Sequence, residues 1–402
     1  MEPWRAFNNC LVFVEDRKYD RMIPFDDSLL LKLNDRKSNG LSRALTTSPL
    51  PEIDFTSNDY LGLARSEELF NTIEENVRLN HPRSNGSTGS RLLSGNSPLI
   101  EEAEENLANI FKGESALMFN SGYAANLAVL SSVPQRGDTI FCDEYSHASI
   151  KDGMRLSFAK RISFRHNDLN DLEGKLRRST GRIYIAVESI YSMDGDVCPL
   201  EELVFLAGKY DGTIILDEAH STGVLGANGA GLAVSLGLEH KIGIRVYTFG
   251  KAMGVHGACV VGPKSLCQYI VNFARPFIYT TAPAPHTVIS ITSSFAYLAQ
   301  HQHLQQELRS NVDEFIRLMN DYPGRTPSSS AIQGVIFAGT QNVRMAANNL
   351  RAKGFDVRPI VYPTVPTGQE RIRICLHTFN TTRQINDLVY ELKLLHTNPI
   401  KV

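Results

Sequence analysis

The chain has 402 residues, and a prior of roughly 150 residues per domain predicts two or three domains. Hydrophobic residues make up 42% of it and charged residues 21%, a composition that excludes a disordered chain, a collagen and a coiled coil. Lysine and arginine total 41 while aspartate and glutamate total 43. The net charge of -2 therefore gives no global reason to expect nucleic acid or an anionic membrane as a partner.

The cysteines and the amino-terminal residues carry no sign of export. The six cysteines are scattered without a C-x-x-C pair, and no H-E-x-x-H motif occurs, so we expect neither a disulfide framework nor a metal site. The apolar run at residues 11–14 is too short for the hydrophobic region of a signal peptide. No stretch of about 18 apolar residues occurs that could cross a membrane. We therefore expect a cytoplasmic protein.

An arm comes first in the predicted order of elements. Residues 1–55 contain one predicted helix, at 26–37, and then a link at 46–51 that is rich in serine, threonine and proline. Residues 1–25 show no pattern that we can assign. We expect residues 1–55 to form an N-terminal arm.

The middle of the chain alternates between short apolar or β-branched strands and helical stretches. The predicted strands lie at residues 116–119, 139–142, 161–164, 183–187, 213–216, 245–249 and 258–261. This alternation predicts an α/β domain with a mostly parallel central sheet, which we place at residues 56–285. Ligands of such sheets lie beyond the carboxyl ends of the strands, so functional residues should follow each strand.

The alternation stops at the proline-rich run 282–285. A long helix is predicted at 287–321, and from there to the last residue helical and strand patterns are mixed. We expect a smaller α+β domain at residues 286–402.

Lys251 closes one predicted strand and opens a glycine-rich turn that contains Gly254 and Gly257. A lysine at this place, among glycines that permit close backbone approach, could be a Schiff-base amine. Taken alone, a surface lysine in a turn is the commoner explanation of the pattern.

Another predicted strand ends in the run Asp217-Glu218-Ala219-His220. Asp217 could keep a pyridine nitrogen protonated while His220 reaches a phenolic oxygen, or Asp217 could simply cap a helix. The same run spells the Walker B motif of one helicase group. The phosphate-binding G-x-x-x-x-G-K-[ST] loop that such an enzyme needs is missing, so a DEAH-type ATPase is only a distant alternative.

Three further loops offer suitable groups at strand ends. Ser121, Gly122 and Tyr123 precede a predicted helix, whose free amides could bind a phosphate. His147 could stack on a planar cofactor, and Ser192 could donate a hydrogen bond. Each also has a plain explanation, as a helix cap, a loop histidine and a turn serine. Together the five loops supply an amine, an acid, an anion site, a ring and a hydroxyl, which is the set that a pyridoxal phosphate site requires.

The motifs resemble those of the α-oxoamine synthases, a family of fold-type I pyridoxal phosphate-dependent transferases, from about residue 55 to residue 392. The likeness is carried by NDYLGL at 58–63, GSTGSRLLSG at 86–95, SGY at 121–123, SHAS at 146–149, SMDG at 192–195, DEAH at 217–220 and TFGK at 248–251. It implies a larger cofactor-binding domain with a smaller C-terminal domain, and a homodimer whose active sites are shared between subunits.

The resemblance also implies a role for each residue. Lys251 would carry pyridoxal 5'-phosphate, Asp217 would pair with its pyridine nitrogen and His147 would stack on its ring, with His220 as the fourth catalytic residue. Further cofactor contacts would come from Ser121, Gly122, Tyr123, Ser192, Thr248, Thr280 and Thr281. Substrate contacts would come from His147 and from Arg43, Asn58, Thr364 and Arg373. Arg373 would receive an amino-acid carboxylate, and Asn58 and the Thr280-Thr281 pair would reach across the subunit boundary.

A narrower likeness at residues 273–281 and 363–373 implies the decarboxylative condensation of L-alanine with a pimeloyl thioester of coenzyme A or of an acyl carrier protein. Serine palmitoyltransferase, 2-amino-3-ketobutyrate CoA ligase and 5-aminolevulinate synthase share most of the motifs and are the alternatives. A binding protein without activity is disfavoured because Lys251, Asp217 and His147 are all present. His256 stands where the family usually has a small residue, and it could narrow the acyl channel.

Overall fold

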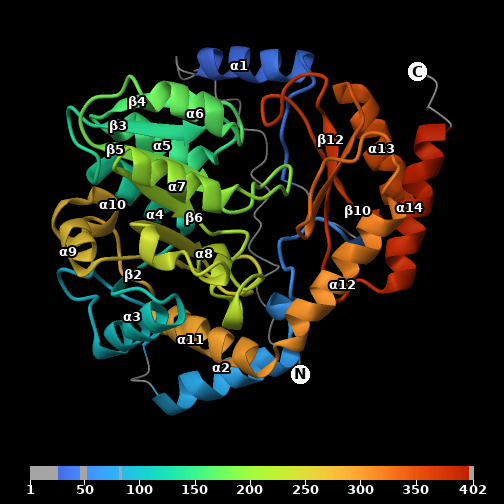
Figure 1. Cartoon of the computed structure of the whole chain (residues 1–402). Helices are drawn as coiled ribbons and strands as arrows, with labels where there is room; N and C mark the ends of the chain where they lie inside the picture. Colours follow the sequence, from blue (N-terminus) through green and yellow to red (C-terminus); the bar gives the residue numbers. More distant parts are fainter. Residues whose placement is uncertain (1–25, 46–51, 81–83, 398–402) are drawn as a thin grey trace. The chain divides into compact units, whose positions relative to one another are not determined.

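Seven strands form the larger sheet of the computed structural model, which describes residues 26–45, 52–80 and 84–397 (Figure 1). They are β2 (Ser115–Phe119), β3 (Thr139–Asp143), β4 (Lys160–Phe164), β5 (Ile183–Glu188), β6 (Gly212–Asp217), β7 (Ile244–Thr248) and β8 (Ala258–Gly262). Their order across the sheet is β2-β8-β7-β6-β5-β3-β4. β8 runs antiparallel to β7 and β2, while the remaining pairs are parallel. The predicted fold class, a mostly parallel sheet with flanking helices, is confirmed.

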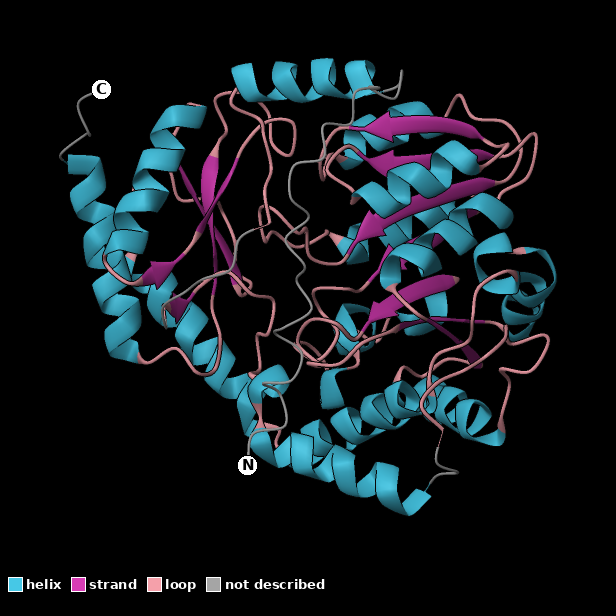
Figure 2. Cartoon of the chain, turned by 180° about the vertical axis from the view of Figure 1, so that it is seen from behind, coloured by secondary structure: helices cyan, strands magenta, loops and turns pink. Residues whose placement is uncertain are grey.

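Helices cover both faces of this sheet (Figure 2). The helices of the larger part are α2 (Glu67–Asn80), α3 (Pro98–Ile110), α4 (Gly122–Ser132), α5 (Ala148–Leu156), α6 (Leu169–Leu176), α7 (Leu200–Lys209), α8 (Gly231–Ser235), α9 (Lys264–Phe273), α10 (Arg275–Ile278) and α11 (Pro285–Gln300). Three short 3-10 turns lie at Leu63–Arg65, Ala227–Gly229 and Glu239–Lys241. Successive side chains of β5 point to opposite faces, so Ala186 joins the core beside α4 and α5, whereas Ile185 joins the core beside α6 and α7.

A second, smaller sheet lies apart from the first (Figure 2). Its antiparallel strands are ordered β11 (Arg358–Ile360), β12 (Arg371–Cys375) and β9 (Ile332–Ile336). β1 (Ile53–Asp54) pairs in parallel with β10 (Phe355–Asp356). The helices of this part are α12 (His303–Leu318), α13 (Thr340–Ala352) and α14 (Thr382–Thr397). This α+β part matters for function because β12 carries Arg373.

Contacts divide the chain into two units, Met1–Pro49 and Leu50–Val402. The first unit contains α1 (Asp26–Ser38), where the sequence predicts a helix. Residues 1–25 and the predicted link at 46–51 lie outside the described residues. The boundaries at residues 55 and 285 stay predictions. None of the described helices combines the length and the apolar character that crossing a bilayer requires.

The single helix predicted at 287–321 is wrong, because the structure has two helices there, α11 and α12. His301 ends α11: its backbone N–H donates to the carbonyls of Tyr297 and Leu298, and its ring Nδ1 lies 2.8 Å from the Tyr297 carbonyl oxygen. The imidazole also stacks on the Tyr297 ring with centroids 3.9 Å apart. The backbone of His301 leaves the helical region, with φ −121° and ψ 45°, and the apolar periodicity of the segment does not reveal this break.

An imidazolium joins the carboxyl ends of three strands. His166, after β4, places Nδ1 2.9 Å from Asp143 Oδ1 at the end of β3 and Nε2 2.7 Å from Asp196 Oδ2 after β5. Both ring nitrogens face carboxylates, so both must donate a proton and the ring is charged. Burial opposes the charge, but the hydrogen bonds to Asp143 and Asp196 outweigh it and raise the pKa of His166 to about 10. The loops that carry His147 and Ser192 are thereby tied together.

Replacing His166 by glutamine keeps the size of the side chain and removes its charge, which leaves two carboxylates without a cation. We expect the free energy of unfolding to fall by about 3 kcal/mol or more at neutral pH. Because the pKa of a histidine rises from about 6.5 in the unfolded chain to about 10 here, the advantage of wild type is complete below about pH 6.5. It then shrinks by about 1.4 kcal/mol per pH unit until the folded pKa is reached.

Denaturant unfolding of both proteins across this pH range measures the difference. The exposed His240 supplies the control, since its replacement by glutamine should leave stability and its pH dependence unchanged. A difference between wild type and H166Q that does not vary with pH would contradict the charge assigned to His166.

Candidate active site

A cavity of about 220 Å³ lies at the carboxyl ends of β3, β5, β6 and β7. Its lining consists of Ser121, Gly122, Tyr123, Asn126, His147, Ser149, Glu188, Asp217, Ala219, His220, Thr248, Gly250, Lys251, His256 and Gly257. The structure therefore brings together the predicted amine, acid, ring and anion site from loops that are far apart in the sequence. His256 also lies in this lining, so the structure places it beside the predicted cofactor residues.

The amine of Lys251 follows β7 and forms part of the cavity wall. Its Nζ lies 2.9 Å from Nε2 of His220. Burial lowers the pKa of the lysine from 10.5 to about 8, although Asp217 and Glu188 act in the opposite direction. A substantial fraction of the amine is therefore neutral near physiological pH, as a nucleophilic lysine requires.

The carboxylate of Asp217 ends β6 at the floor of the cavity. One oxygen accepts a hydrogen bond of 2.7 Å from Asn126 Nδ2 and the other accepts one of 2.9 Å from the backbone N–H of Ala219. These two donors hold the carboxylate in place without neutralising its charge. A cationic ring nitrogen in the cavity can therefore pair with it.

An anion can bind where α4 begins. Ser121 caps the helix, since its hydroxyl accepts the N–H of Ala124, and the amides of Gly122 and Tyr123 precede the first bonds within the helix. A Cβ on Gly122 would come within 2.2 Å of the Thr248 methyl carbon, so only glycine permits this approach. The buried hydroxyl of Thr248 has no hydrogen-bond partner among the described residues. A phosphate at this place would satisfy it, and the donors present fit pyridoxal phosphate.

His147 lines the same cavity and caps α5. Its ring Nδ1 accepts from the backbone N–H of Ser149 at 3.2 Å, and the backbone N–H of His147 donates to Glu188 Oε1 at 2.6 Å. Burial lowers the pKa of the imidazole, which keeps the ring neutral. A neutral ring held at both its backbone and its side chain is suited to stacking on a flat cofactor.

Glu188 is a site residue that sequence reasoning missed. It ends β5 directly opposite Asp217 of β6, and it is 3% exposed. Burial, together with the neighbouring Asp217 carboxylate, raises the pKa of Glu188 to about 8, so it carries its proton at neutral pH. Its position at the end of a fully buried strand was the available signal.

Arg373 connects to the cavity through a line of hydrogen bonds. From β12 its Nε donates to the Ser192 carbonyl at 2.7 Å and its Nη2 donates to Asn58 Oδ1 at 2.9 Å. Asn58 also lies 3.1 Å from the hydroxyl of Tyr60, which is 2.8 Å from Nδ1 of His220. These contacts of Asn58 lie within its own chain, and its predicted reach across a subunit boundary stays a prediction. Tyr60 is a second residue that sequence reasoning missed.

An adjoining cavity of about 690 Å³ shares His147 with the first. It is lined by Glu144, Tyr145, Ser146, His147, Ala148, Lys151, Tyr191, Ser192, Met193, Asp194, Tyr362, Pro363, Thr364, Val365, Pro366 and Arg371. Ser192, predicted at the phenolic oxygen of the cofactor, and Thr364, predicted at the substrate, both lie in this second lining. The first cavity can hold a flat cofactor, and the second can hold the acyl chain of a substrate.

Two sets of predicted residues remain, the Thr280-Thr281 pair and Arg43. The carbonyl of Thr281 accepts from Asn120 Nδ2 at 2.8 Å, and neither Thr280 nor Thr281 lines the cavity of its own chain. Arg43 belongs to the first unit, and its role toward a substrate stays a prediction.

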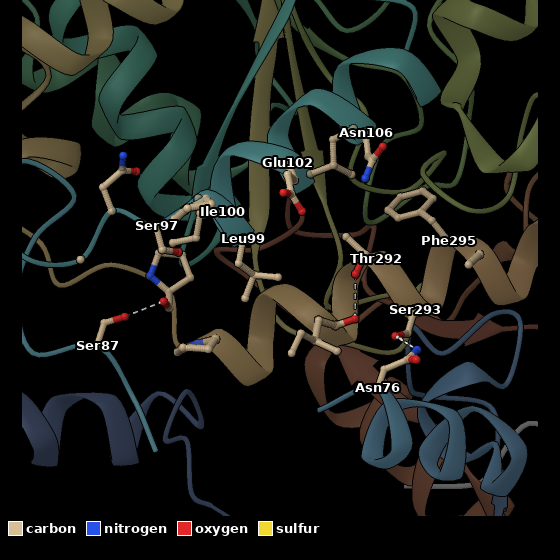
Figure 3. Close-up of a pocket in the computed structure, with 18 of the residues that line it drawn as sticks. Asn76, Ser87, Ser97, Leu99, Ile100, Glu102, Asn106, Thr292, Ser293 and Phe295 are labelled. Atoms are coloured by element: carbon tan, nitrogen blue, oxygen red, sulfur yellow. Dashed lines mark hydrogen bonds between the residues drawn. The ribbon is translucent and has the colours of Figure 1, made fainter. Parts of the chain in front are cut away.

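A further cavity, of about 1150 Å³, opens between α3 and α11 (Figure 3). Its lining combines apolar side chains with hydroxyl and amide groups: Ser87 donates to the Pro283 carbonyl at 2.8 Å, and Asn76 donates to Ser293 at 2.9 Å. Among the described residues of its lining, Glu102 is the one charged side chain. None of the predicted site residues lies there, and we expect the chemistry in the smaller cavity.

Comparison with known proteins agrees with the chemistry of the smaller cavity. The family described as aminotransferase class I and II matches residues 51–389. The chain is 39% identical over 388 residues to 8-amino-7-oxononanoate synthase of Emericella nidulans, with 90% of this chain and 94% of the relative covered. It is 38% identical over 374 residues to a putative 8-amino-7-oxononanoate synthase of Bacillus licheniformis, with coverages of 92% and 97%.

Solved structures give two further matches. Serine palmitoyltransferase of S. paucimobilis with a bound PLP-myriocin aldimine superposes with a TM-score of 0.83 at 27% identity, over 94% of this chain and 98% of the other. 8-Amino-7-oxononanoate synthase of Francisella tularensis superposes with a TM-score of 0.73 at 29% identity, over 86% and 98%. Pyridoxal phosphate is thus the cofactor of this protein.

Borohydride reduction of the protein loaded with pyridoxal phosphate should fix the cofactor on Lys251, because its buried amine is the nucleophile of the cavity. Peptide mapping of the reduced protein locates the label. K251A should take up no label, whereas K151A should still be labelled on Lys251. A label on any other lysine in wild type would disprove the assignment.

Replacing Asp217 by asparagine preserves the volume and removes the negative charge that faces the ring nitrogen. We expect kcat to fall by at least about 100-fold while the cofactor stays bound, since every step that places charge on the ring depends on this carboxylate. Turnover and cofactor absorbance are measured on the same samples, with the exposed D313N as control. Unchanged turnover would mean that Asp217 only caps the turn at Ala219.

Proposed function

This chain belongs to the class I and II aminotransferase family and, within it, to the α-oxoamine synthases, and on this basis we propose that it condenses L-alanine with a pimeloyl thioester. The products are 8-amino-7-oxononanoate, CO2 and a free thiol, a step of biotin biosynthesis. The observation that supports this choice most directly is the identity of 38–39% to relatives of that name, which extends over 94–97% of their length. A cytoplasmic location stays a prediction.

The residues of the smaller cavity divide the work on the amino acid. Pyridoxal phosphate, when bound, supplies a sink for the negative charge that develops at the amino-acid Cα. Asp217 keeps the ring nitrogen protonated, and His147 holds the ring flat from one side. The amine of Lys251 is close enough to neutral to take the Cα proton and later return it.

Arg373 is the group that we assign to the carboxylate of alanine. Its guanidinium donates to the Ser192 carbonyl and to Asn58 Oδ1, so its orientation does not depend on the substrate. A guanidinium binds a carboxylate with two parallel charge-assisted hydrogen bonds, which fixes the amino acid in one orientation. The Cα–H bond is then presented to Lys251.

The cavity of about 690 Å³ is the place that we assign to the acyl thioester. It adjoins the cofactor cavity at His147, and its aromatic, proline and valine side chains suit a short methylene chain. Thr364 lies in its lining and can donate to a carbonyl oxygen. The carrier is either coenzyme A or an acyl carrier protein.

Serine palmitoyltransferase activity is the second candidate. The higher TM-score, 0.83 against 0.73, favours it, although the identity to those enzymes is lower than to the curated relatives. The two functions differ in both substrates, so one kinetic comparison separates them.

We expect the pairing of alanine with pimeloyl thioester to exceed every other combination in kcat/KM by at least about tenfold, the equivalent of about 1.4 kcal/mol. The measurement crosses pimeloyl, acetyl, succinyl and palmitoyl thioesters with alanine, glycine and serine, on both carriers. A preference for serine with palmitoyl, or for glycine with either short acyl group, would identify one of the alternative family members instead.

We also propose that two chains form a homodimer with shared sites. Thr280 and Thr281 lie outside the cavity of their own chain, and the neighbouring Tyr279 is 73% exposed. These features suit a loop that completes the phosphate site of a second copy.

Mixing K251A with the double variant T280A/T281A tests the homodimer. Each variant alone should be nearly inactive. A hybrid dimer contains one site with Lys251 and both threonines intact, so unfolding and refolding an equal mixture should recover about a quarter of wild-type activity. Recovery of nothing from a mixture that light scattering shows to be dimeric would mean that the threonines do not serve the partner's site.

A further inference from the structure

Tyr60 lies at the centre of a hydrogen-bonded line that runs from Arg373 to Lys251. The steps are 2.9 Å from Arg373 Nη2 to Asn58 Oδ1, 3.1 Å from there to the Tyr60 hydroxyl, and 2.8 Å onward to His220 Nδ1. The line ends with 2.9 Å between His220 Nε2 and Lys251 Nζ. Tyr60 is 1% exposed and His220 is 4% exposed, so water does not compete with these contacts.

The donor and the acceptor of each hydrogen bond in this series follow from the guanidinium of Arg373. A guanidinium can only donate, so Asn58 must present its carbonyl oxygen to Arg373. This oxygen carries no proton, and its contact with Tyr60 is favourable only if the tyrosine proton points toward it. The Tyr60 oxygen must then accept the next hydrogen bond, and His220 Nδ1 is the group that donates it.

The same reasoning determines which ring nitrogen of His220 carries the proton. Burial holds the pKa of His220 well below its usual value, so the ring carries a single proton. That proton is on Nδ1, where Tyr60 accepts it. Nε2 therefore presents a lone pair, and the Lys251 amine donates an N–H to it.

We infer that Tyr60 is a positioning residue that fixes the tautomer of His220 and thereby leaves the lone pair of Lys251 free to react. With the opposite tautomer, the Nε2–H would donate to the amine and occupy this lone pair. The lone pair is what forms the C–N bond when an amine condenses with an aldehyde and one water molecule is released. The inference rests on the proposed role of Lys251 but not on the identity of either substrate.

Two variants separate this role from mere packing. Y60F keeps the ring that fills the core and removes the oxygen, so His220 Nδ1 loses its acceptor. N58A leaves Tyr60 intact but removes the acceptor of its proton, so the hydroxyl turns to donate to Nδ1. Both variants should move the proton of His220 to Nε2. The control is Y322F, which removes a hydroxyl that donates to the Leu392 carbonyl away from the site.

Two measurements use the cofactor-free protein. Nitrogen NMR of labelled histidine, assigned with H220Q, reports which ring nitrogen carries the proton at neutral pH. We expect Nδ1 in wild type and Y322F, and Nε2 in Y60F and N58A. The rise of absorbance after pyridoxal phosphate is added should be slower by about tenfold or more in Y60F and N58A, a loss comparable to one hydrogen bond.

Several outcomes would overturn the inference. They are a proton on Nε2 in wild type, an unchanged tautomer in N58A and Y60F, or a changed tautomer with an unchanged rate of cofactor uptake. If Y60F does not fold, as thermal unfolding would show, N58A alone decides between the outcomes. Neither measurement includes alanine or a thioester, so a failure here leaves the proposed reaction to be judged by its own kinetic comparison.

Discussion

The parallel register of β5 and β6 sets Glu188 opposite Asp217, and this pairing of two buried acids next to one buried amine governs the site. Burial and the neighbouring Asp217 carboxylate raise the pKa of Glu188 to about 8, so Glu188 keeps its proton at neutral pH. Lys251, in turn, is kept partly neutral by burial. The pairing of β5 with β6 thus places the protonated Glu188 and Asp217 beside the reactive amine of Lys251.

Glu188 also fixes the position of a neighbouring loop. It accepts the backbone N–H of His147, so the loop that carries the predicted stacking ring is tied to the strand that carries the protonated acid. The imidazolium of His166 joins the same loop to the turn after β5. That turn provides the Ser192 carbonyl, which Arg373 binds from the smaller sheet. The residues predicted to contact the cofactor and the arginine that we assign to the substrate are thus coupled through these contacts.

Much of the fold could be predicted because the strands are short, apolar and separated by helices of ordinary length. A parallel sheet then places the residues after each strand at one edge, which is why Lys251, Asp217 and His147 meet as expected. Patterns of this kind contain no information on where the backbone leaves the helical region within an apolar segment. It does so at His301, and the helix break there was not predicted.

The amino-acid sequence by itself determined the sheet, the order of its loops and the residue types that pyridoxal phosphate chemistry needs. Only the tertiary structure decided which residues contact one another across the two sheets. Asn58 binds Arg373 of its own chain, and Tyr60 bridges Asn58 to His220. Such contacts join positions that lie far apart in the sequence, and their geometry depends on how two independently patterned parts pack. The protonation of Glu188 has the same origin, because it depends on burial and on a neighbouring strand rather than on local sequence.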